Sequence, residues 1–371
     1  MIKEQTTLFK ALLLSQLPMV GNITARKLLA ECGSIDAVFE TKKSKLLSIE
    51  GIGEIVVNNI RHIPEKVYET VEKEMLFIEK QKIHTFLITE EDYPKRLKHC
   101  VDAPLLFFGK GTINFNVAKV VAIVGTRKAS PYGIAFTKQL IEELVSMDVL
   151  VISGLAYGID TAAHEASVHH NLQTIGVLGH GLHMLYPASN CKLASRMLRK
   201  GGLITEFISG TGPDAINFPT RNRIIAGLSD AIIVVEARKE GGALITANLG
   251  FSYDRDIFSV PGRVGDLQSE GCNNLIKSNK AALITSAKDV IQLMRWDETP
   301  AHKKKRQQKM FFDLSPEEEK VIKVIQEHEE IDIDTLVSKI NIPLSRLTTL
   351  LLTLECNAYI ECLPGKRYKI V

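Results

Sequence analysis

The spacing of apolar residues changes along the chain. Between Thr7 and Lys80, leucines recur at helical intervals and glycines stand at the breaks, which predicts short helices joined by tight turns. From about Ile83 to Trp296, short β-branched runs alternate with amphipathic stretches. This alternation is typical of a parallel sheet covered by helices on both faces. We expect strands within residues 117–124, 149–152, 174–178, 231–235 and 257–260.

A different pattern begins near residue 299. Residues 301–312 carry five basic residues, no acid and no apolar period, as expected of a linker. Beyond them the pattern predicts three helices and then two short strands around Pro364 and Gly365, which is the winged-helix order. We therefore predict a helical domain at residues 1–82, a doubly wound, mostly parallel α/β domain at 83–298, a basic linker at 299–312 and a winged-helix domain at 313–371.

Two segments of the N-terminal helical domain share one form. Residues 17–21 lead into a helical stretch at 23–29, and residues 49–53 lead into another at 55–60. Both resemble the helix-hairpin-helix unit of SAM-like domains, in which glycines let the backbone approach a phosphate. A small helical bundle that uses glycine at helix ends explains the pattern equally well.

Composition and charge narrow the classes of protein. The 371 residues are 45% hydrophobic and 24% charged, which excludes a disordered chain. A formal net charge of +3 excludes a polybasic coating, so any cationic surface must be local. The six cysteines include no Cys-x-x-Cys pair, which argues against zinc and a redox cycle. Because no apolar run fits a secretory signal or a membrane span, we expect a cytoplasmic protein without a membrane partner.

The candidate chemistry follows the predicted strands, because ligands of doubly wound sheets bind beyond the carboxyl ends of the strands. Glycines and cations gather in these turns, which favours a phosphate held by backbone amides and side chains. Ser130 and Asp160 are expected to cap the helices that follow. Another helix is expected from about Thr220, with Arg221 and Asn222 in its first turn. The dinucleotide fingerprint and the P-loop are both missing, which disfavours a dinucleotide and ATP-driven chemistry.

Acidic residues and histidines raise two other possibilities, an enzyme and a metal site. An enzyme on this fold would need an acid or base, and Glu206 and Glu236 stand at strand ends, where a structural hydrogen bond is the commoner role. Five histidines crowd residues 164–183, but they fall on different predicted elements. A metal site needs converging ligands and usually a carboxylate or cysteine. We therefore expect no bound metal and no cofactor.

Eight motifs run in order between Val124 and Ile276. They are Val124-Gly-Thr-Arg127, Ser153-Gly-Leu-Ala-Tyr-Gly-Ile-Asp-Thr-Ala-Ala-His164, Gly179-His-Gly-Leu, Tyr186-Pro-x-x-Asn190, Phe218-Pro-Thr-Arg-Asn-Arg-Ile-Ile-Ala-Gly-Leu-Ser229, Gly242-Ala-Leu-Ile-Thr-Ala247, Val260-Pro-Gly262 and Gly271-Cys-Asn-Asn-Leu-Ile276. In this order and spacing the chain resembles the DNA-processing family DprA, also called Smf. Longer members of that family carry similar flanking domains.

The resemblance implies an extended Rossmann fold, related to that of nucleotide phosphoribohydrolases. It implies a mediator without catalytic residues that protects incoming single-stranded DNA during natural transformation and loads RecA onto it. It also implies a homodimer formed through the central domain. Residues 239–246 lack the hydrolases' Pro-Gly-Gly-x-Gly-Thr-x-x-Glu turn, which disfavours nucleotide hydrolysis. Hydrolysis on the same fold is therefore kept only as the alternative function.

The resemblance and the positions of the predicted turns together define the expected DNA-binding residues. Arg127 matches the family's DNA-contacting arginine after the first strand. Tyr132, Tyr157, Tyr186 and Phe218 lie near the turns and could stack on bases. The winged helix has few free cations in its third helix, so we expect it to contribute little DNA affinity. The expected DNA-binding residues are Gly125, Thr126, Arg127, Lys128, Ser153, Gly154, Gly158, Asn190, Lys192, Arg221, Asn222, Arg223 and Gly242.

Overall fold

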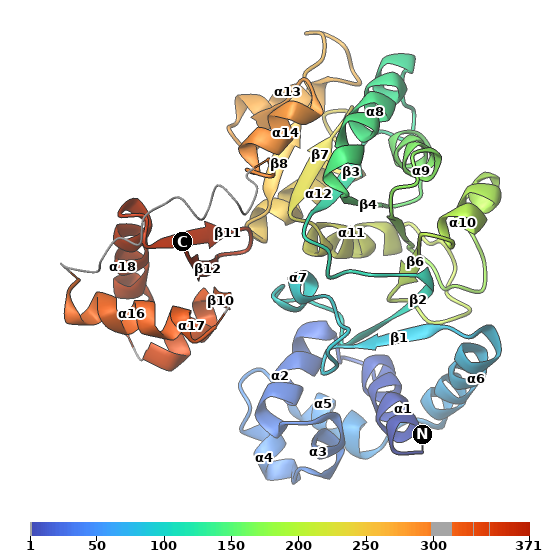
Figure 1. The fold of residues 1–371 in the computed structure, drawn as a ribbon. Coiled ribbons are helices and arrows are strands. Elements are labelled where there is room, and N and C mark those ends of the chain that lie inside the picture. The colour runs from blue at the N-terminus through green and yellow to red at the C-terminus, as the bar shows by residue number, and fades with distance from the viewer. Residues whose placement is uncertain (1, 298–313, 329, 341) are drawn as a thin grey trace.

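The computed structural model describes residues 2–297, 314–328, 330–340 and 342–371. The predicted linker at 299–312 lies outside these ranges, so the domain boundaries at its two ends stay predictions. Within the described ranges, an N-terminal group of helices, a central α/β sheet and a small C-terminal unit follow one another (Figure 1). This order confirms the fold class expected from the sequence.

The N-terminal group contains two helix-hairpin-helix turns. Both α2 and α5 begin directly after a glycine in extended conformation, Gly21 and Gly53. Ser34 caps α3 by accepting a hydrogen bond from the Ala37 amide. The six helices are α1 (Ile2–Gln16), α2 (Asn22–Cys32), α3 (Ile35–Glu40), α4 (Lys43–Leu47), α5 (Glu54–Arg61) and α6 (Glu65–Gln81).

The central sheet has nine strands within the described residues, in the order β1-β2-β6-β5-β4-β3-β7-β8-β9. The pairs from β6 to β9 are all parallel, while β1 and β2 add two antiparallel pairings at one edge. Each of the five predicted apolar runs overlaps one strand, and β4 and β8 extend one residue beyond the predicted bounds. The strands are β1 (His84–Leu87), β2 (Leu106–Thr112), β3 (Val120–Val124), β4 (Leu150–Ser153), β5 (Thr174–Val177), β6 (Gly201–Thr205), β7 (Ala231–Val234), β8 (Asp256–Ser259) and β9 (Ala282–Leu283).

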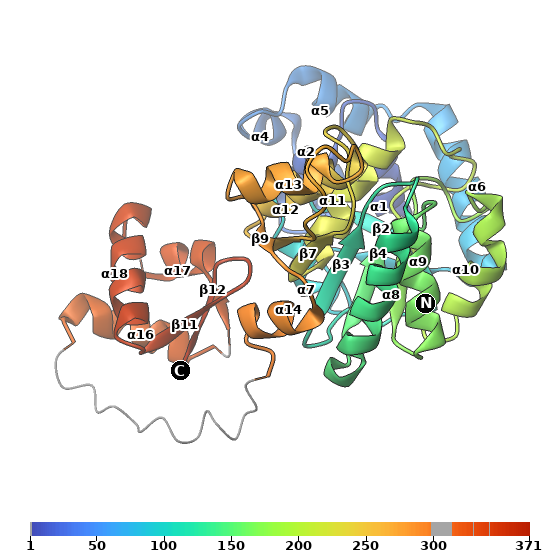
Figure 2. The ribbon, with the colours of Figure 1, turned by 90° about the horizontal axis from the view of Figure 1, so that it is seen from above.

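Helices cover both faces of the sheet, as Figure 2 shows from above. On β3, Val121 and Ile123 face a core shared with α8, α9 and α14. The alternate residues Val120 and Ala122 face a second core, which contains α11, α12 and the N-terminal helices. The connecting helices are α7 (Lys95–Lys98), α8 (Pro131–Leu144), η1 (Val145–Met147), α9 (Ile159–His169), η2 (Ala188–Asn190), α10 (Cys191–Met197), α11 (Asn217–Leu228), α12 (Gly242–Ser252), α13 (Glu270–Lys277) and α14 (Ala287–Leu293).

The C-terminal unit follows the winged-helix order and has its own apolar core. Its three-stranded antiparallel sheet has the order β10-β12-β11. The wing, residues 364–366, joins β11 to β12 and touches the central domain, where the Lys366 ammonium lies 3.3 Å from the Asp254 carboxylate. The elements are α16 (Pro316–Gln326), β10 (Ile331–Asp332), α17 (Ile333–Ile340), α18 (Leu344–Cys356), β11 (Ile360–Leu363) and β12 (Arg367–Ile370).

The length and the apolar character of a helix decide whether it can cross a membrane. Among the residues that the structure describes, no helix combines the length and apolar character needed to cross a bilayer.

Candidate functional site

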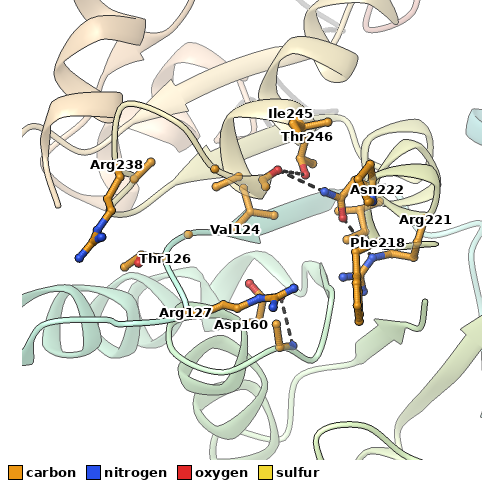
Figure 3. Close-up of a pocket in the computed structure, with 18 of the residues that line it drawn as sticks. Val124, Thr126, Arg127, Asp160, Phe218, Arg221, Asn222, Arg238, Ile245 and Thr246 are labelled. Atoms are coloured by element: carbon orange, nitrogen blue, oxygen red, sulfur yellow. Dashed lines mark hydrogen bonds between the residues drawn. The ribbon is translucent and has the colours of Figure 1, made fainter. Parts of the chain in front are cut away.

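A cavity of about 470 Å³ opens where the order of the strands reverses. The chain runs from β3 to β4 on one side of β3 and returns later to place β7 on its other side. The residues that follow β3, β4 and β7 line the cavity together with the first turns of α11 and α12 (Figure 3). Such a switch point is the usual ligand site of a doubly wound sheet, so the cavity lies where the sequence predicts it.

Two glycines let the turns after β3 and β4 approach each other. A Cβ at Gly125 would collide with the side chain of Ile159. Gly158 has a φ of +80°, and a Cβ there would collide with the Thr126 carbonyl oxygen, which accepts a hydrogen bond from the Ile159 amide at 3.3 Å. Glycine is required at both places. The two turns are therefore held in fixed contact beneath the cavity.

Arg127 is exposed at the mouth of this cavity. Its guanidinium carbon lies 5.0 Å from the centre of the Phe218 ring, within the range of a cation–π contact. Figure 3 shows the Arg127 side chain extending from the turn after β3 toward Phe218. Tyr157, Tyr186 and Leu178 line a small recess beside the same two residues. Cationic and aromatic groups thus stand together at one opening.

The opposite side of the cavity comes from the turn after β7 and the start of α12. Arg238 is exposed there, beside Gly241 and Gly242. The Asn222 side chain donates to the Gly242 carbonyl oxygen at 3.2 Å and accepts from Arg221 Nε at 3.1 Å. Asn222 and Gly242 therefore line the cavity, as expected, and Asn222 ties α11 to α12. Within the described ranges, Arg127 and Arg238 form no ion pair with a carboxylate.

Arg221 lies deeper than the sequence predicts. Because α11 begins at Asn217 rather than near Thr220, Arg221 falls in the second turn and is only 4% exposed. Its Nη1 donates to the carbonyl oxygens of Gly154, at 2.7 Å, and Val177. A Cβ at Gly154 would collide with this guanidinium. The placement in the first turn was wrong, and Arg221 joins the ends of β4 and β5.

Arg223 points away from the cavity, whose lining does not include it. It forms an ion pair with Glu206 and donates to the Asp102 carbonyl oxygen at 2.5 Å. Burial raises the pKa of Glu206, although the nearby Arg223 opposes this shift. The pair belongs to the contact between the central domain and α2, since Asn22 also donates to Glu206 at 3.3 Å.

The remaining predicted residues divide into buried supports and exposed cations. Ser153 is buried and donates to the Ile123 carbonyl oxygen at 2.6 Å. Asn190 is 5% exposed, and its amide donates to the Leu155 carbonyl oxygen at 3.0 Å. Lys128, beside Arg127, and Lys192, on α10, are exposed. Neither lysine lines the cavity.

Two carboxylates at the ends of the strands, Glu236 and Asp160, have structural partners. Glu236 accepts from the Ser130 amide at 2.9 Å and from the Ser130 hydroxyl, and Ser130 caps α8 as predicted. Asp160 was expected to cap the next helix, but Gly158 is the N-cap of α9. The Asp160 carboxylate accepts instead from the amides of Gly154 and Ala156, at 3.1 and 3.3 Å. Its pKa is raised by burial, although Arg221 opposes this shift.

A buried histidine lies on α9, whose N-terminus borders the cavity. Thr174 donates its hydroxyl proton to the Val151 carbonyl oxygen at 2.9 Å, so His164 Nδ1, 2.7 Å from that hydroxyl, is the donor in their contact. His164 Nε2 is buried without a partner. Burial lowers the pKa of His164 to about 3. No group of three or more His, Cys, Asp or Glu suited to a metal ion occurs in the described part of the chain.

The site thus combines two exposed guanidiniums, an aromatic ring and backbone from glycine turns around one cavity. Arg238 was not among the residues expected from the sequence, although it lies only three residues after the end of the predicted strand at 231–235. Pro213 and Ala215, which reach the cavity from an irregular segment, were not predicted either. This combination suits an anionic ligand with flat aromatic parts.

Comparisons with known proteins identify the family to which this chain is related. The family described as DNA recombination-mediator protein A matches residues 84–295, and the helix-hairpin-helix motif matches residues 12–66. Over 224 residues, 60% of this chain and 79% of the relative, the chain is 38% identical to the DNA processing protein DprA of Streptococcus pneumoniae.

Two solved structures extend the likeness to the fold. The X-ray structure of Streptococcus pneumoniae DprA superimposes with a TM-score of 0.65 and 34% identity, covering 76% of this chain and 95% of that one. The structure of Helicobacter pylori DNA processing protein A, described for its single-stranded DNA binding mode, gives 0.53 and 27%, covering 59% and 98%. With a family match over more than half of its length, the chain belongs to the DNA recombination-mediator protein A family, the DprA/Smf family.

Proposed function

We propose that the chain binds single-stranded DNA in the cavity between β3 and β7, protects the strand and delivers RecA to it. The observation that carries this proposal is the exposed Arg127, whose guanidinium lies 5.0 Å from the Phe218 ring at the mouth of the cavity. A nucleotide offers an anionic phosphate and a flat base, and this pair of side chains suits both. The binding mode described for the Helicobacter pylori relative supports the same ligand.

The electrostatics favour a strand over a small neutral ligand. Arg127 and Arg238 have no carboxylate partner within the described ranges, so both can bind phosphate without breaking an ion pair. The exposed rings of Tyr157 and Tyr186, beside Phe218, provide apolar surface on which a base can stack. Binding then depends on salt through the arginines and on stacking through the rings.

The expected DNA-binding residues take three roles in this proposal. Some face the strand at the cavity, some hold the turns and the neighbouring segments in place through close or buried contacts, and two exposed lysines lie outside the cavity along a path that a longer strand could follow. The first group is Gly125, Thr126, Arg127, Asn222 and Gly242; the second is Ser153, Gly154, Gly158, Asn190, Arg221 and Arg223; the third is Lys128 and Lys192.

We propose a function without catalysis. Nucleotide hydrolysis would need a free acid or base at the cavity, yet Glu206 and Glu236 are outside its lining and bound to Arg223 and Ser130. Of the two acids in the cavity lining, Asp160 has its carboxylate occupied by backbone amides, whereas Glu240 is exposed in the turn after β7. Incubation with a panel of nucleoside monophosphates is expected to release no base. Release that Glu206→Gln, Glu236→Gln or Glu240→Gln abolishes would favour the hydrolase instead.

RecA delivery and self-association complete the proposal. We propose a homodimer through the central domain, supported by the free edge of the sheet at β9, where Leu283 is 49% exposed, because uncovered edge strands tend to pair. Light scattering after gel filtration tests the dimer, and Leu283→Lys should give monomers. A shorter lag in RecA ATPase activity on an oligonucleotide, with this protein present, would support delivery. As a DNA recombination mediator it would act in the cytoplasm.

Fluorescence anisotropy with a labelled oligo-dT tests the central claim. Arg127→Ala is expected to weaken binding about tenfold, because a hydrogen bond to a charged group contributes about 1.5 kcal/mol. Its matched control is Arg199→Ala, which removes an exposed arginine near the end of α10, outside the cavity. Equal affinity of both variants and the wild type at moderate salt would show that the strand binds elsewhere.

A further inference from the structure

One wall of the cavity comes from an irregular stretch of chain. Residues 206–216 connect β6 to α11 and form neither a helix nor a strand; they are called the wall segment below. Pro213 and Ala215 of this segment line the cavity, and Phe218 follows two residues after its end. Because the segment lacks a ladder of backbone hydrogen bonds, its position depends on contacts with its neighbours.

The N-terminal helices supply one of these contacts. Glu74, on α6, accepts two hydrogen bonds from Ser209 of the wall segment. The Ser209 amide donates to Glu74 Oε2 at 2.8 Å, and the Ser209 hydroxyl donates to the same oxygen. One carboxylate oxygen therefore binds both polar hydrogens of a single residue that lies 135 positions along the chain.

Glu74 is an unusual residue for its place. It is 3% exposed and shares the buried face of α6 with Val71 and Ile78, where an apolar side chain would be expected. Burial raises the pKa of Glu74, although its hydrogen bonds with Ser209 oppose this shift. A carboxylate at such a position costs desolvation energy unless it is hydrogen-bonded. Among the described residues, Ser209 is the hydrogen-bond partner of its side chain.

Other contacts fix both sides of Ser209. At the start of the wall segment, Glu206 accepts from Asn22 of α2 at 3.3 Å. Directly after Ser209, the Gly210 amide donates to His183 Nδ1 at 3.1 Å. The Gly181 amide donates to the Thr211 carbonyl oxygen at 3.0 Å. The N-terminal helices thus hold the first part of the segment, and the turn after β5 holds the next residues.

We propose that Glu74 is a positioning residue of the DNA cavity. By binding Ser209 it fixes the wall segment and with it Pro213, Ala215 and the start of α11 that carries Phe218. Through this contact the N-terminal helices influence the affinity for single-stranded DNA from outside the cavity. This inference rests on the proposed function of the cavity.

Because Glu74 is charged, the electrostatic explanation and the positioning role predict opposite changes in DNA affinity. Removing a carboxylate lowers the negative charge near a polyanion, and Coulomb's law alone predicts tighter binding. The positioning role predicts weaker binding, by about five- to tenfold for Glu74→Ala. Glu74→Gln keeps an oxygen that can accept from Ser209, so it should bind oligo-dT within twofold of the wild type. The salt slope should stay unchanged in both, because Glu74 contacts no phosphate.

Hydrogen exchange provides the second measurement. In Glu74→Ala, peptides that cover residues 206–216 should exchange faster, while peptides from α1 and α5 keep their protection. Asp36→Ala is the matched control, because it breaks the 2.5 Å ion pair between Lys10 and Asp36 within the N-terminal helices, far in sequence from the wall segment. It should leave both DNA affinity and exchange at 206–216 unchanged.

Several results would overturn the inference. Faster exchange at 206–216 with unchanged DNA affinity would show that the contact exists but does not position the cavity. Equal loss of affinity in Glu74→Ala and Asp36→Ala would mean that general stability is responsible. If Glu74→Ala does not fold, Ser209→Ala decides, with an expected two- to threefold loss. Wild-type protein that fails to bind oligo-dT would overturn the proposed function as well, whereas a normal Arg127 effect with neutral Glu74 and Ser209 variants would overturn this inference alone.

Discussion

The cavity and the C-terminal wing both carry basic side chains, yet they use them differently. At the cavity, Arg127 and Arg238 are exposed and form no ion pair with any described residue. On the wing and the strand after it, every basic side chain lies near a carboxylate. These pairs are Lys366–Asp254 at 3.3 Å, Arg367–Glu330 at 2.7 Å and Lys369–Glu361 at 3.2 Å.

This difference concerns the availability of charge rather than its amount. A cation that binds phosphate releases counterions from the strand, which favours binding. A cation that already has a carboxylate partner must first give up that partner, so its net gain is smaller. The same residue types therefore indicate a ligand site in one region and a packing contact in the other.

The largest expected effect comes from removing both free arginines. Arg127→Ala combined with Arg238→Ala should cost about 3 kcal/mol of binding free energy, or about a hundredfold in affinity for oligo-dT. The slope of log affinity against log salt should become shallower by about 1.4, since each phosphate contact contributes about 0.7. Anisotropy titrations at several salt concentrations measure both. An unchanged slope would mean that the two arginines contact no phosphate, and the contrast between the cavity and the wing would not hold.

Phe218 tests the aromatic part of the cavity. Phe218→Ala should weaken binding by about 2 kcal/mol, or about thirtyfold, because stacking on a base contributes about 1–3 kcal/mol. The salt slope should not change, since no charge is removed. Phe218→Tyr keeps the ring and is expected to bind like the wild type in the same titration. A change in slope for Phe218→Ala would mean that the ring acts only by holding Arg127.

The pH dependence of the free energy of unfolding tests the burial of His164 on α9. His164 has a pKa of about 3 in the folded protein, against about 6.5 when unfolded. Between these values the unfolded state binds more protons, so stability falls as pH decreases. From pH 7 to pH 5 the loss due to His164 should be about 2 kcal/mol. Urea unfolding of the wild type and His164→Asn at both pH values measures it by difference.

The control for this experiment lies on the same helix. His169 is exposed at the end of α9, so His169→Asn should keep the full pH dependence of the wild type. Wild-type pH dependence in His164→Asn would contradict the assignment.

The smallest effect is expected on the wing. Replacing Lys366, Arg367 and Lys369 together with alanine should change oligo-dT affinity by less than twofold, because these cations already have partners and surface pairs contribute about 0–1 kcal/mol. The anisotropy assay used for the arginine pair measures this directly. A tenfold loss would show that the wing releases its partners to bind DNA, and the comparison between the regions would fail.

The sequence predicts the sheet well where strands are buried on both faces. β3 is a continuous apolar run, Val120–Val124, and such runs are hard to mistake. β6 was not among the predicted runs because it begins with Gly201 and Gly202. A Cβ at Gly201 would collide with the Thr174 carbonyl oxygen of the neighbouring strand. Only the packing of the two strands explains these glycines, and no local pattern could reveal it.

The sequence predicted where the candidate site lies in the fold, but it did not predict which of its residues are buried. The glycines after β3 and β4 and the exposed Arg127 are properties of short turns, which the local sequence largely determines. The burial of Arg221 and Arg223 depends on partners far along the chain, such as Gly154 and Glu206. Side chains with the same charge in one motif thus differ in exposure, and only the tertiary contacts decide which of them can meet a ligand.

The N-terminal helices share one continuous apolar core with one face of the sheet. Leu12 and Leu28 belong to the same buried cluster as Phe107 of β2 and Val120 of β3, whereas the C-terminal unit has a separate cluster around Leu347. Elements that share a core tend to unfold cooperatively. Calorimetry should therefore record one large melting transition for the helices together with the sheet and a separate, smaller one for the C-terminal unit. A fragment cut near residue 82 would leave an apolar surface exposed on both pieces.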